Sequence, residues 1–187
     1  MLTSPVVRCV KLQTGGEVHF LTKKKYISIL ESNPYVDKII SFENNLNVLL
    51  VALRKEKYNY VIDLHNNLRS FWIKLYLQKR SYTIRKKNLE KFLFIHFGIN
   101  LMKDHVVERY FQPLTSISVT NDNQGLDYFI SPMIRVNINP KEEFIAWCIG
   151  ASYHQKTLSK NQIIEVANKL PYSIILLGGI EEKLIGD

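Results

Sequence analysis

The sequence predicts an α/β protein built on a doubly wound parallel sheet. Helical and strand-like patterns alternate along most of the chain, and strands separated by helices of this length indicate βαβ units. Residues 60–64 form a nearly continuous apolar run that only Asp63 interrupts. Such a run suits a strand buried on both faces, as parallel sheets require. The same alternation begins again after a polar stretch near residues 121–140, which indicates a second unit of the same kind.

The first 120 residues supply most of the expected elements. Ser4 and Pro5 provide a helix cap and a first-turn proline, and the helix that follows ends at Gly15-Gly16. Asn33-Pro34 ends the next helical stretch, because the residue before a proline avoids the helical region. We expect strands at 17–22, 38–42, 58–64 and 81–84, and further helices at 23–32, 46–57, 68–77, 89–97 and 104–116.

The composition turns polar at residues 121–125 and again at 137–140, and we place the domain connection across this region. The prediction is an N-terminal domain over residues 1–136 and the start of a second domain over 137–187. In the second, we expect a strand at 144–149, a helix at 160–169 and a strand at 173–177. The chain opens on a helix that should follow a strand and closes as a new helix begins. We therefore expect both domains to be incomplete.

Composition excludes several classes of protein. No apolar run approaches the roughly 20 residues of a membrane span. No basic stretch followed by an apolar run marks a secretory signal, so we expect a cytoplasmic protein, either free or peripheral at the inner membrane. Cys9 and Cys148 lie far apart in apolar patterns, and we expect two buried, unpaired thiols.

The net charge of +8 has two interpretations. Clusters of Lys and Arg are often solvated helix ends. They could instead attract anionic partners such as phosphorylated glycolipid, the headgroups of an anionic membrane or a nucleotide. Nucleic acid is not expected, because the basic residues are not interleaved with aromatic residues in a known binding motif. The clusters fall at 23–25, 54–57, 79–80 and 85–91.

One group of candidate site residues follows the expected strand at 58–64. Asp63 and His65 stand at its carboxyl end, where ligands bind in open α/β sheets. They could form an acid–base pair, or Asp63 could cap the next helix through backbone amides. Asn67 extends the polar edge, and Arg69 is placed to meet a phosphate or carboxylate.

A second group surrounds the expected helix start at residues 104–110. Arg109 could contact a phosphorylated acceptor, because a guanidinium matches phosphate geometry. The alternative is a solvated first turn with Val106 and Val107 packed inward.

Two small-residue turns follow the strands of the second unit. Gly150-Ala151-Ser152 with nearby Lys156 lets a phosphate approach the backbone beside a positive charge, although no Walker loop is present. Gly178-Gly179 is followed by Glu181 and Glu182, which could accept hydrogen bonds from ribose hydroxyls or could simply begin a helix. No zinc-type spacing or nucleophile elbow occurs, so we expect no metal and no cofactor.

These segments together resemble the glycosyltransferases of family 9, the ADP-heptose:lipopolysaccharide heptosyltransferases. The similarity runs in order through the whole chain. Its motifs are LTSPVVR at 2–8, VHFLT at 18–22, NPYVDKII at 33–40, YVIDLH at 60–65, IGA at 149–151 with Lys156, and LLGG at 176–179 with Glu181-Glu182.

The resemblance implies a GT-B fold, in which two Rossmann-like domains face each other across a cleft. It implies that heptose moves with inversion from an ADP-heptose-like donor to the inner core of lipopolysaccharide. Lys156 would hold donor phosphate with Ser152 in the turn beside it, and Glu181 or Glu182 would face the ribose. We assign acceptor binding to residues of the N-terminal domain, namely Asp63, His65, Asn67, Arg69 and Arg109.

The sequence departs from the family at both ends. The Ser-x-Gly-Asp loop that carries the family's general base would fall upstream of Met1, and a later donor-binding segment would fall beyond Asp187. We therefore assign no catalytic residue and expect an inactive fragment. Two alternatives stay open: a non-catalytic module that binds phosphorylated glycolipid, and another GT-B enzyme such as a nucleotide-sugar epimerase.

Overall fold

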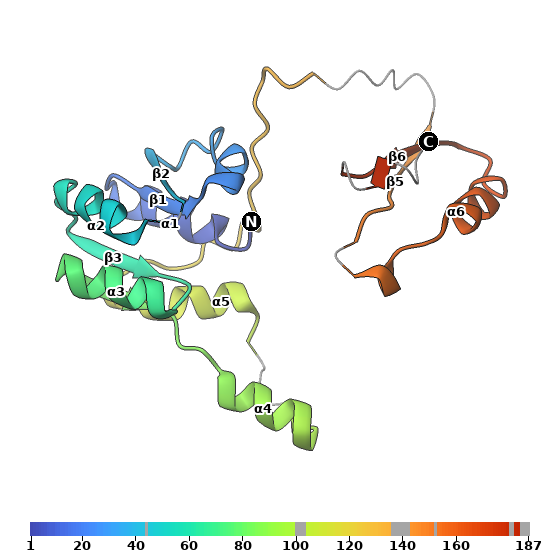
Figure 1. Cartoon of the computed structure of the whole chain (residues 1–187). Coiled ribbons are helices and arrows are strands. Elements are labelled where there is room, and N and C mark those ends of the chain that lie inside the picture. Colours follow the sequence, from blue (N-terminus) through green and yellow to red (C-terminus); the bar gives the residue numbers. More distant parts are fainter. Residues whose placement is uncertain (44, 100–103, 136–142, 152, 180–181, 184–187) are drawn as a thin grey trace. The chain divides into compact units, whose positions relative to one another are not determined.

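The computed structural model describes residues 1–187 except 44, 100–103, 136–142, 152, 180–181 and 184–187. The chain divides into two compact units, Met1–Ile134 and Arg135–Asp187 (Figure 1). Within the described residues, no helix is long and apolar enough to cross a membrane.

Unit 1 holds two pairs of parallel strands. β1 (His19–Lys23) pairs with β2 (Lys38–Phe42), and β3 (Tyr60–Asp63) pairs with β4 (Arg80–Thr83). The helices are α1 (Ser4–Thr14), α2 (Leu46–Lys55), α3 (Leu68–Leu77), α4 (Asn88–Phe97) and α5 (Val106–Phe111). Each described strand is hydrogen-bonded to one neighbour, so the described strands of unit 1 form two separate pairs.

Local signals in the sequence explain the ends of the best-defined helices. Pro5 occupies the first turn of α1, and Gly15 ends the helix in the left-handed region at φ +63°, with its N–H donated to Lys11 O. At the start of α3, Asn67 and Ser70 form a reciprocal capping box.

Two expected helices of unit 1 are wrong. The helix expected at 23–32 is a 3₁₀ helix, Lys24–Ile29, without a buried residue. The helix expected at 104–116 ends at Phe111, and a 3₁₀ helix, Gln112–Ile117, follows it. Pro113 lies in the first turn of that 3₁₀ helix; it has no N–H to donate, and its ring would clash inside a continuing α-helix.

Two expectations about burial are also wrong. The β3 residues Tyr60, Val61 and Ile62 are only half-buried, because β3 has a neighbour on one side alone. Cys148 is exposed, whereas Cys9 is buried and free as expected, and burial raises the pKa of the Cys9 thiol.

Unit 1 has two hydrophobic cores. In the first, α1 and α5 pack together with half-buried residues of β3 and β4, among them Ile62 and Tyr82. In the second, α2 and α3 pack with residues of β1 and β2, among them Leu21 and Ile40. Helices thus form separate cores with different strands, as expected of a doubly wound sheet with helices on both faces.

The side chain of Arg8 lies in the interior of unit 1 and is 2% exposed. Its Nε and Nη2 atoms donate to the two carboxylate oxygens of Asp122 at 2.8 and 2.7 Å, and Nη2 also donates to Gly125 O at 3.1 Å. Nη1 donates to Asp127. The hydrogen bonds from Arg8 are the main reason why the pKa of Asp122 is held at about 2. All three nitrogen atoms of the guanidinium therefore donate hydrogen bonds that fix residues 122–127 to α1.

Further bonds attach the same segment along α1. Ser4 Oγ accepts from Asp127 N at 2.8 Å. Gln13 and Thr120 form a two-way pair, in which the Gln13 amide donates to Thr120 O at 2.7 Å and accepts from Thr120 N at 2.9 Å. The polypeptide after the 3₁₀ helix is thus bound to α1 at both ends of the helix.

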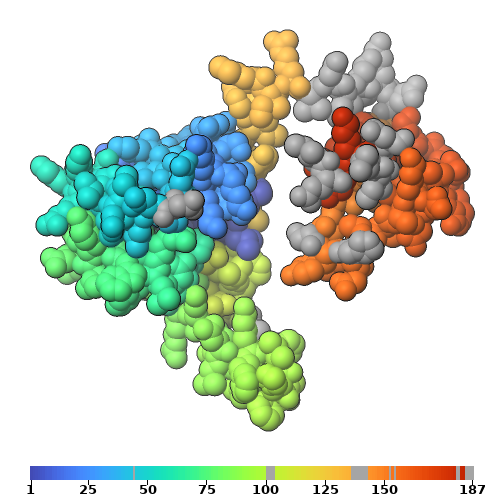
Figure 2. Space-filling model, in the orientation of Figure 1, coloured from blue at the N-terminus to red at the C-terminus, as the bar shows by residue number. Residues whose placement is uncertain are grey.

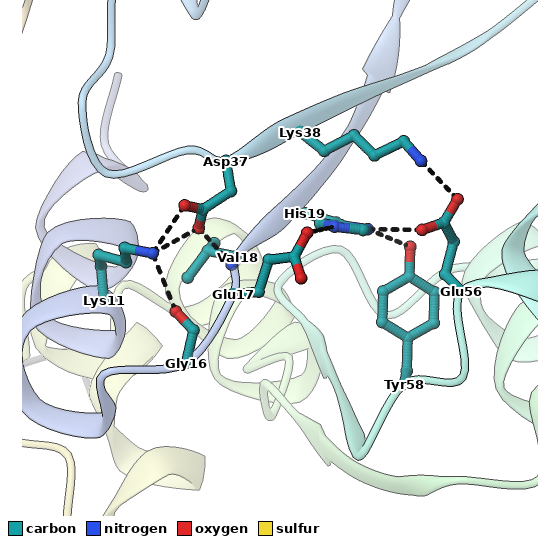
Figure 3. Close-up of polar contacts among 9 residues, drawn as sticks. All are labelled: Lys11, Gly16, Glu17, Val18, His19, Asp37, Lys38, Glu56 and Tyr58. Carbon is teal, nitrogen blue, oxygen red and sulfur yellow. Dashed lines mark hydrogen bonds and ion pairs between the residues drawn. The ribbon is translucent and has the colours of Figure 1, made fainter.

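The amino ends of β1 and β2 are joined by side chains (Figure 3). Lys11 Nζ lies 2.7 Å from both carboxylate oxygens of Asp37 and donates to Gly16 O at 3.1 Å. Asp37 also accepts from Val18 N at 2.7 Å. This carboxylate therefore connects α1 with the residues that precede β1 and β2.

A neighbouring cluster joins β1 to the connection between α2 and β3 (Figure 3). His19 Nδ1 lies 2.9 Å from Tyr58 Oη, and His19 Nε2 lies 2.8 Å from Glu17 Oε1. Glu56 accepts from Lys38 at 2.5 Å. Burial, supported by the charges of Glu56 and Glu17, raises the pKa of Tyr58 to about 12. The tyrosine is therefore a neutral hydrogen-bonding group at physiological pH.

Unit 2 contains one parallel pair, β5 (Phe144–Cys148) and β6 (Ser173–Leu177), and the helix α6 (Lys160–Ala167) between them. Ser159 and Gln162 form the capping box of α6. Ile149 and Ile163 are its buried apolar residues within the described part. The unit is therefore one βαβ element.

We expect Arg8→Ala to lower the free energy of unfolding by about 3 to 5 kcal/mol, because it leaves two partly buried carboxylates without a cation. Urea unfolding followed by circular dichroism measures the change. Lys24→Ala is the control, since the Lys24–Glu43 pair is exposed and should contribute nothing measurable. Equal midpoints for the two variants would contradict the role of Arg8.

Acid should weaken unit 1 in a defined range of pH. The folded state holds the pKa of Asp122 at about 2, below its ordinary value of 3.8. Its contribution to stability is complete above about pH 4 and is lost as the pH falls toward 2. In Asp122→Asn, the free energy of unfolding should depend less steeply on pH over this range than in the parent. Parallel pH profiles for the two proteins would contradict the assignment.

Candidate functional site

The carboxyl ends of the strands form one edge in each parallel pair of unit 1. Lys23 of β1 lies in register with Phe42 of β2, and Asp63 of β3 with Thr83 of β4. Ligands bind at this edge in open α/β sheets. The polar network of Figure 3 lies at the opposite, amino edge, where His19 and Lys38 begin their strands. We therefore place the candidate site at the carboxyl edge.

Asp63 organises the loop that follows β3. It is 5% exposed, and its Oδ1 accepts from the backbone N–H groups of His65 and Asn66 at 3.0 and 2.8 Å. Lys74 Nζ lies 2.8 Å from Oδ2, an ion pair by distance rather than a well-aligned hydrogen bond. Burial raises the pKa of Asp63, but Lys74 and the loop amides outweigh it and lower the pKa below its usual value. Asp63 is therefore an ionised carboxylate that is already engaged.

The rest of the loop is fixed by local bonds. Asn66 adopts a positive φ of 46° and donates through its side chain to Ile84 O at 3.0 Å, which ties the loop to the end of β4. Asn67 caps α3, so its side-chain oxygen is used by Ser70 N. His65 is exposed, as are Asn66 and Asn67.

Two arginines flank this edge. Arg69 is exposed, and its guanidinium lies 4.3 Å from the centre of the Phe42 ring, so it spans from α3 to the end of β2. Arg109 donates to Arg85 O at 3.2 Å, which places it beside the segment that leaves β4. Its Nε is buried and has no hydrogen-bond partner among the described residues. Arg69 therefore presents an exposed guanidinium at this edge, whereas the unpartnered Nε of Arg109 is enclosed by the protein.

In unit 2, Glu182 lies between the carboxyl ends of β5 and β6. Its Oε2 accepts from Gly179 N at 2.7 Å. A Cβ atom at Gly150 would lie 2.9 Å from Glu182 Cδ, and one at Gly178 would lie 2.9 Å from Glu182 Cβ. The close approach of Glu182 Cβ favours glycine at position 178, whereas at Gly150 the contact is with the flexible carboxylate end of the glutamate, which can move aside.

Lys156 ends the 3₁₀ helix His154–Lys156 and is exposed. Its ammonium lies 5.5 Å from the centre of the Tyr153 ring. No carboxylate pairs with it among the described residues, so its charge is available to an anion. Ser152 and Glu181 lie outside the described residues.

The sequence analysis missed one residue that builds this edge, Lys74. Lys74 pairs with Asp63 and also donates to Thr83 Oγ1 at 2.8 Å, so it connects β3, β4 and α3. Lys74 stands between Ile73 and Leu75 in an apolar helical pattern, and nothing in that pattern indicates Asp63 as its partner.

The parallel strand pairs and the helices between them match the GT-B fold of two solved glycosyltransferase structures. Among solved structures, the chain is similar to a glycosyl transferase family 9 protein from Veillonella parvula DSM 2008, with a TM-score of 0.72 and 19% identity over 98% of this chain and 60% of that one. It is also similar to E. coli ADP-heptose LPS heptosyltransferase II, with a TM-score of 0.65 and 16% identity over 99% of this chain and 62% of that one.

These similarities confirm, at the level of fold, the resemblance to family 9 that the sequence predicts. The chain spans about three fifths of the length of the two proteins. No protein-family model and no curated protein matches the sequence.

We expect Asp63→Ala to lower the free energy of unfolding by about 3 kcal/mol, because it removes the carboxylate that pairs with Lys74 and leaves two loop amides without their acceptor. Asp63→Asn keeps the acceptor and should cost less. Glu43→Ala is the control, since its lysine pair is exposed. Urea unfolding measures all three. An Asp63→Ala variant as stable as Glu43→Ala would mean that the loop is held by other contacts.

Proposed function

We propose that the chain belongs to a glycosyltransferase that moves a sugar from a nucleotide donor, ADP-heptose or a close analogue, to a phosphorylated glycolipid such as the inner core of lipopolysaccharide. The observation that carries the proposal is the match of 98–99% of the chain to the fold of a family 9 glycosyl transferase and of an ADP-heptose LPS heptosyltransferase. In this proposal, residues 1–136 form the acceptor domain and residues 137–187 belong to the donor domain.

Unit 2 has chemistry suited to a nucleotide diphosphate. Lys156 follows β5, and no described carboxylate pairs with its ammonium; a lysine near a small-residue turn stabilises phosphate as a point charge. Glu182 keeps one carboxylate oxygen beyond the bond to Gly179, and this oxygen could accept from a ribose hydroxyl. We assign Lys156 and Glu182 to the donor, with Ser152 and Glu181 as their sequence neighbours.

Unit 1 has chemistry suited to a phosphorylated acceptor. The exposed guanidinium of Arg69 and the partly exposed side chain of Arg109 lie at the carboxyl edge, and guanidinium groups match phosphate geometry. We assign these arginines, with His65 and Asn67, to the acceptor. Asp63 shapes their loop as an engaged carboxylate, which makes it a positioning residue rather than a base.

An inverting transfer also needs a general base on the acceptor hydroxyl. We assign that role to no residue among 1–187, because Asp63 is already bonded and His65 belongs to the binding edge. The free cysteines Cys9 and Cys148 support a reducing compartment, and we propose a cytoplasmic location.

A second function is favoured by the basic edge of unit 1, which would bind a phosphorylated glycolipid without any transfer. Measurement of glycolipid binding and of sugar transfer from ADP-heptose on the same preparation separates the two. Transfer supports the enzyme, whereas glycolipid binding without ADP binding supports the module.

Lys156→Ala should weaken ADP binding roughly 10- to 150-fold, because a charged hydrogen bond to phosphate contributes about 1.5 to 3 kcal/mol. Isothermal titration calorimetry of the chain with ADP measures this, and UDP and GDP test the choice of base. Lys160→Ala, a second exposed lysine of unit 2, is the matched control and should leave affinity unchanged. Equal ADP affinity in parent and Lys156→Ala would remove Lys156 from the donor site.

A further inference from the structure

Helix α3 has two opposite apolar faces. One face packs into unit 1 through Ile73, which is 6% exposed, with Tyr76 and Leu77 beside it. The other face carries an exposed stripe with the spacing i, i+3, i+4, i+7, which places its residues on one side of a helix. The stripe consists of Leu68, Phe71, Trp72 and Leu75, which are 81, 54, 53 and 53% exposed.

An exposed stripe of this composition is unusual for a surface helix. The outer face of such a helix normally carries polar residues, and a contiguous apolar patch marks an interaction site. The stripe cannot be explained by the core of unit 1, because α3 already contributes its opposite face to that core. It is therefore a surface that suits an apolar partner.

The charge around the stripe restricts what that partner can be. Residues 64–89 include seven Lys or Arg and no Asp or Glu, so this stretch carries most of the net charge of +8. Lys74 and Lys87 are engaged with Asp63 and Asp104. The other five basic side chains are exposed: Arg69, Lys79, Arg80, Arg85 and Lys86.

The next helix continues the same composition. Six of the ten residues of α4 are apolar, yet none is buried. Ile95 is 74% and Phe97 is 65% exposed. In Figure 2 the yellow-green atoms of α4 are open to the surroundings on the side in view. A helix that is apolar on most sides is normally buried against other protein segments or in a membrane. The basic residues Arg85 and Lys86 lie shortly before α4 in the sequence.

We propose that α3 and the basic residues around it dock unit 1 on an anionic lipid bilayer. Aromatic and aliphatic side chains enter the boundary between headgroups and acyl chains, while Lys and Arg contact lipid phosphates. A protein partner would explain an apolar stripe, but the absence of acidic residues from 64–89 matches a uniformly anionic surface better. The inference rests on the surface of unit 1 and does not depend on the glycosyltransferase proposal.

Trp72 reports the docking directly, because the chain has one other tryptophan, Trp147. In a Trp147→Phe background, the emission of Trp72 should shift to the blue with vesicles of phosphatidylglycerol mixed with phosphatidylcholine. Lipids brominated on the acyl chains should quench it. Pure phosphatidylcholine should give little change, and added salt should reverse the binding. Vesicles without any glycolipid keep this test separate from acceptor recognition.

Charge and apolar variants test the two components. Arg85→Gln with Lys86→Gln should lower the vesicle partition coefficient roughly 30-fold, at about fivefold per basic residue. Lys23→Gln with Lys25→Gln removes the same charge elsewhere in unit 1 and should have a much smaller effect. Phe71→Ser with Leu75→Ser should abolish docking without lowering the thermal midpoint, since both side chains are exposed.

Three results would overturn the proposal. The first is Trp72 emission that anionic vesicles leave unchanged. The second is equal partitioning of the Arg85/Lys86 and the Lys23/Lys25 double variants. The third is a salt-insensitive dimer in sedimentation velocity that Phe71→Ser with Leu75→Ser dissociates, which would assign the stripe to a second copy of the chain.

Discussion

The guanidinium of Arg8 is the centre on which the architecture of unit 1 depends. In most α/β domains a continuous hydrogen-bonded sheet connects the elements, but here the described strands form separate pairs. Side chains supply the connections between them. Arg8 fixes residues 122–127 to α1, Lys11 joins α1 to Asp37, and His19 meets Tyr58 between β1 and β3. A buried cation is costly to desolvate, so Arg8 stabilises unit 1 only because its donors meet two carboxylates and a carbonyl.

This distribution of bonds gives the two edges of unit 1 different chemistry. At the amino edge, the carboxylates of Asp37 and Glu56 and the ring of His19 are all satisfied within the protein, so little capacity is left for a ligand. At the carboxyl edge, Asp63 is engaged, but the guanidinium of Arg69 is exposed. The same difference holds in unit 2, where Glu182 closes the turn and Lys156 is unpaired among described residues. Both units therefore offer positive charge at the edge where α/β folds bind ligands.

Sequence reasoning succeeded where the signal is local. Helix Leu68–Leu77 and strands Lys38–Phe42 and Ser173–Leu177 have the predicted bounds, because capping residues and short apolar runs act within a few positions. It failed where the cause is a single backbone constraint, as at Pro113, or a distant partner. Arg8 stands among valines in a helical apolar pattern, and nothing in that pattern indicates Asp122, 114 positions away. For the same reason the sequence placed Asp63 at a strand end but could not show that Lys74 neutralises it.

Helix α3 connects the carboxyl edge, the hydrophobic core and the exposed apolar surface of unit 1, because a different part of the helix contributes to each. Its capping residue, Asn67, ends the loop that Asp63 shapes, and its second residue, Arg69, reaches the carboxyl edge over Phe42. Its inner face forms the core with α2, and its outer face carries Phe71 and Trp72. If the outer face lies in the headgroup region of a bilayer, Arg69 at the start of the same helix lies within one turn of lipid phosphates. A glycolipid could then keep its acyl chains in the bilayer while its phosphorylated sugars meet the edge. The capping box and the buried Ile73 fix α3 to unit 1, so α3 would set the distance between the carboxyl edge of the strands and the membrane.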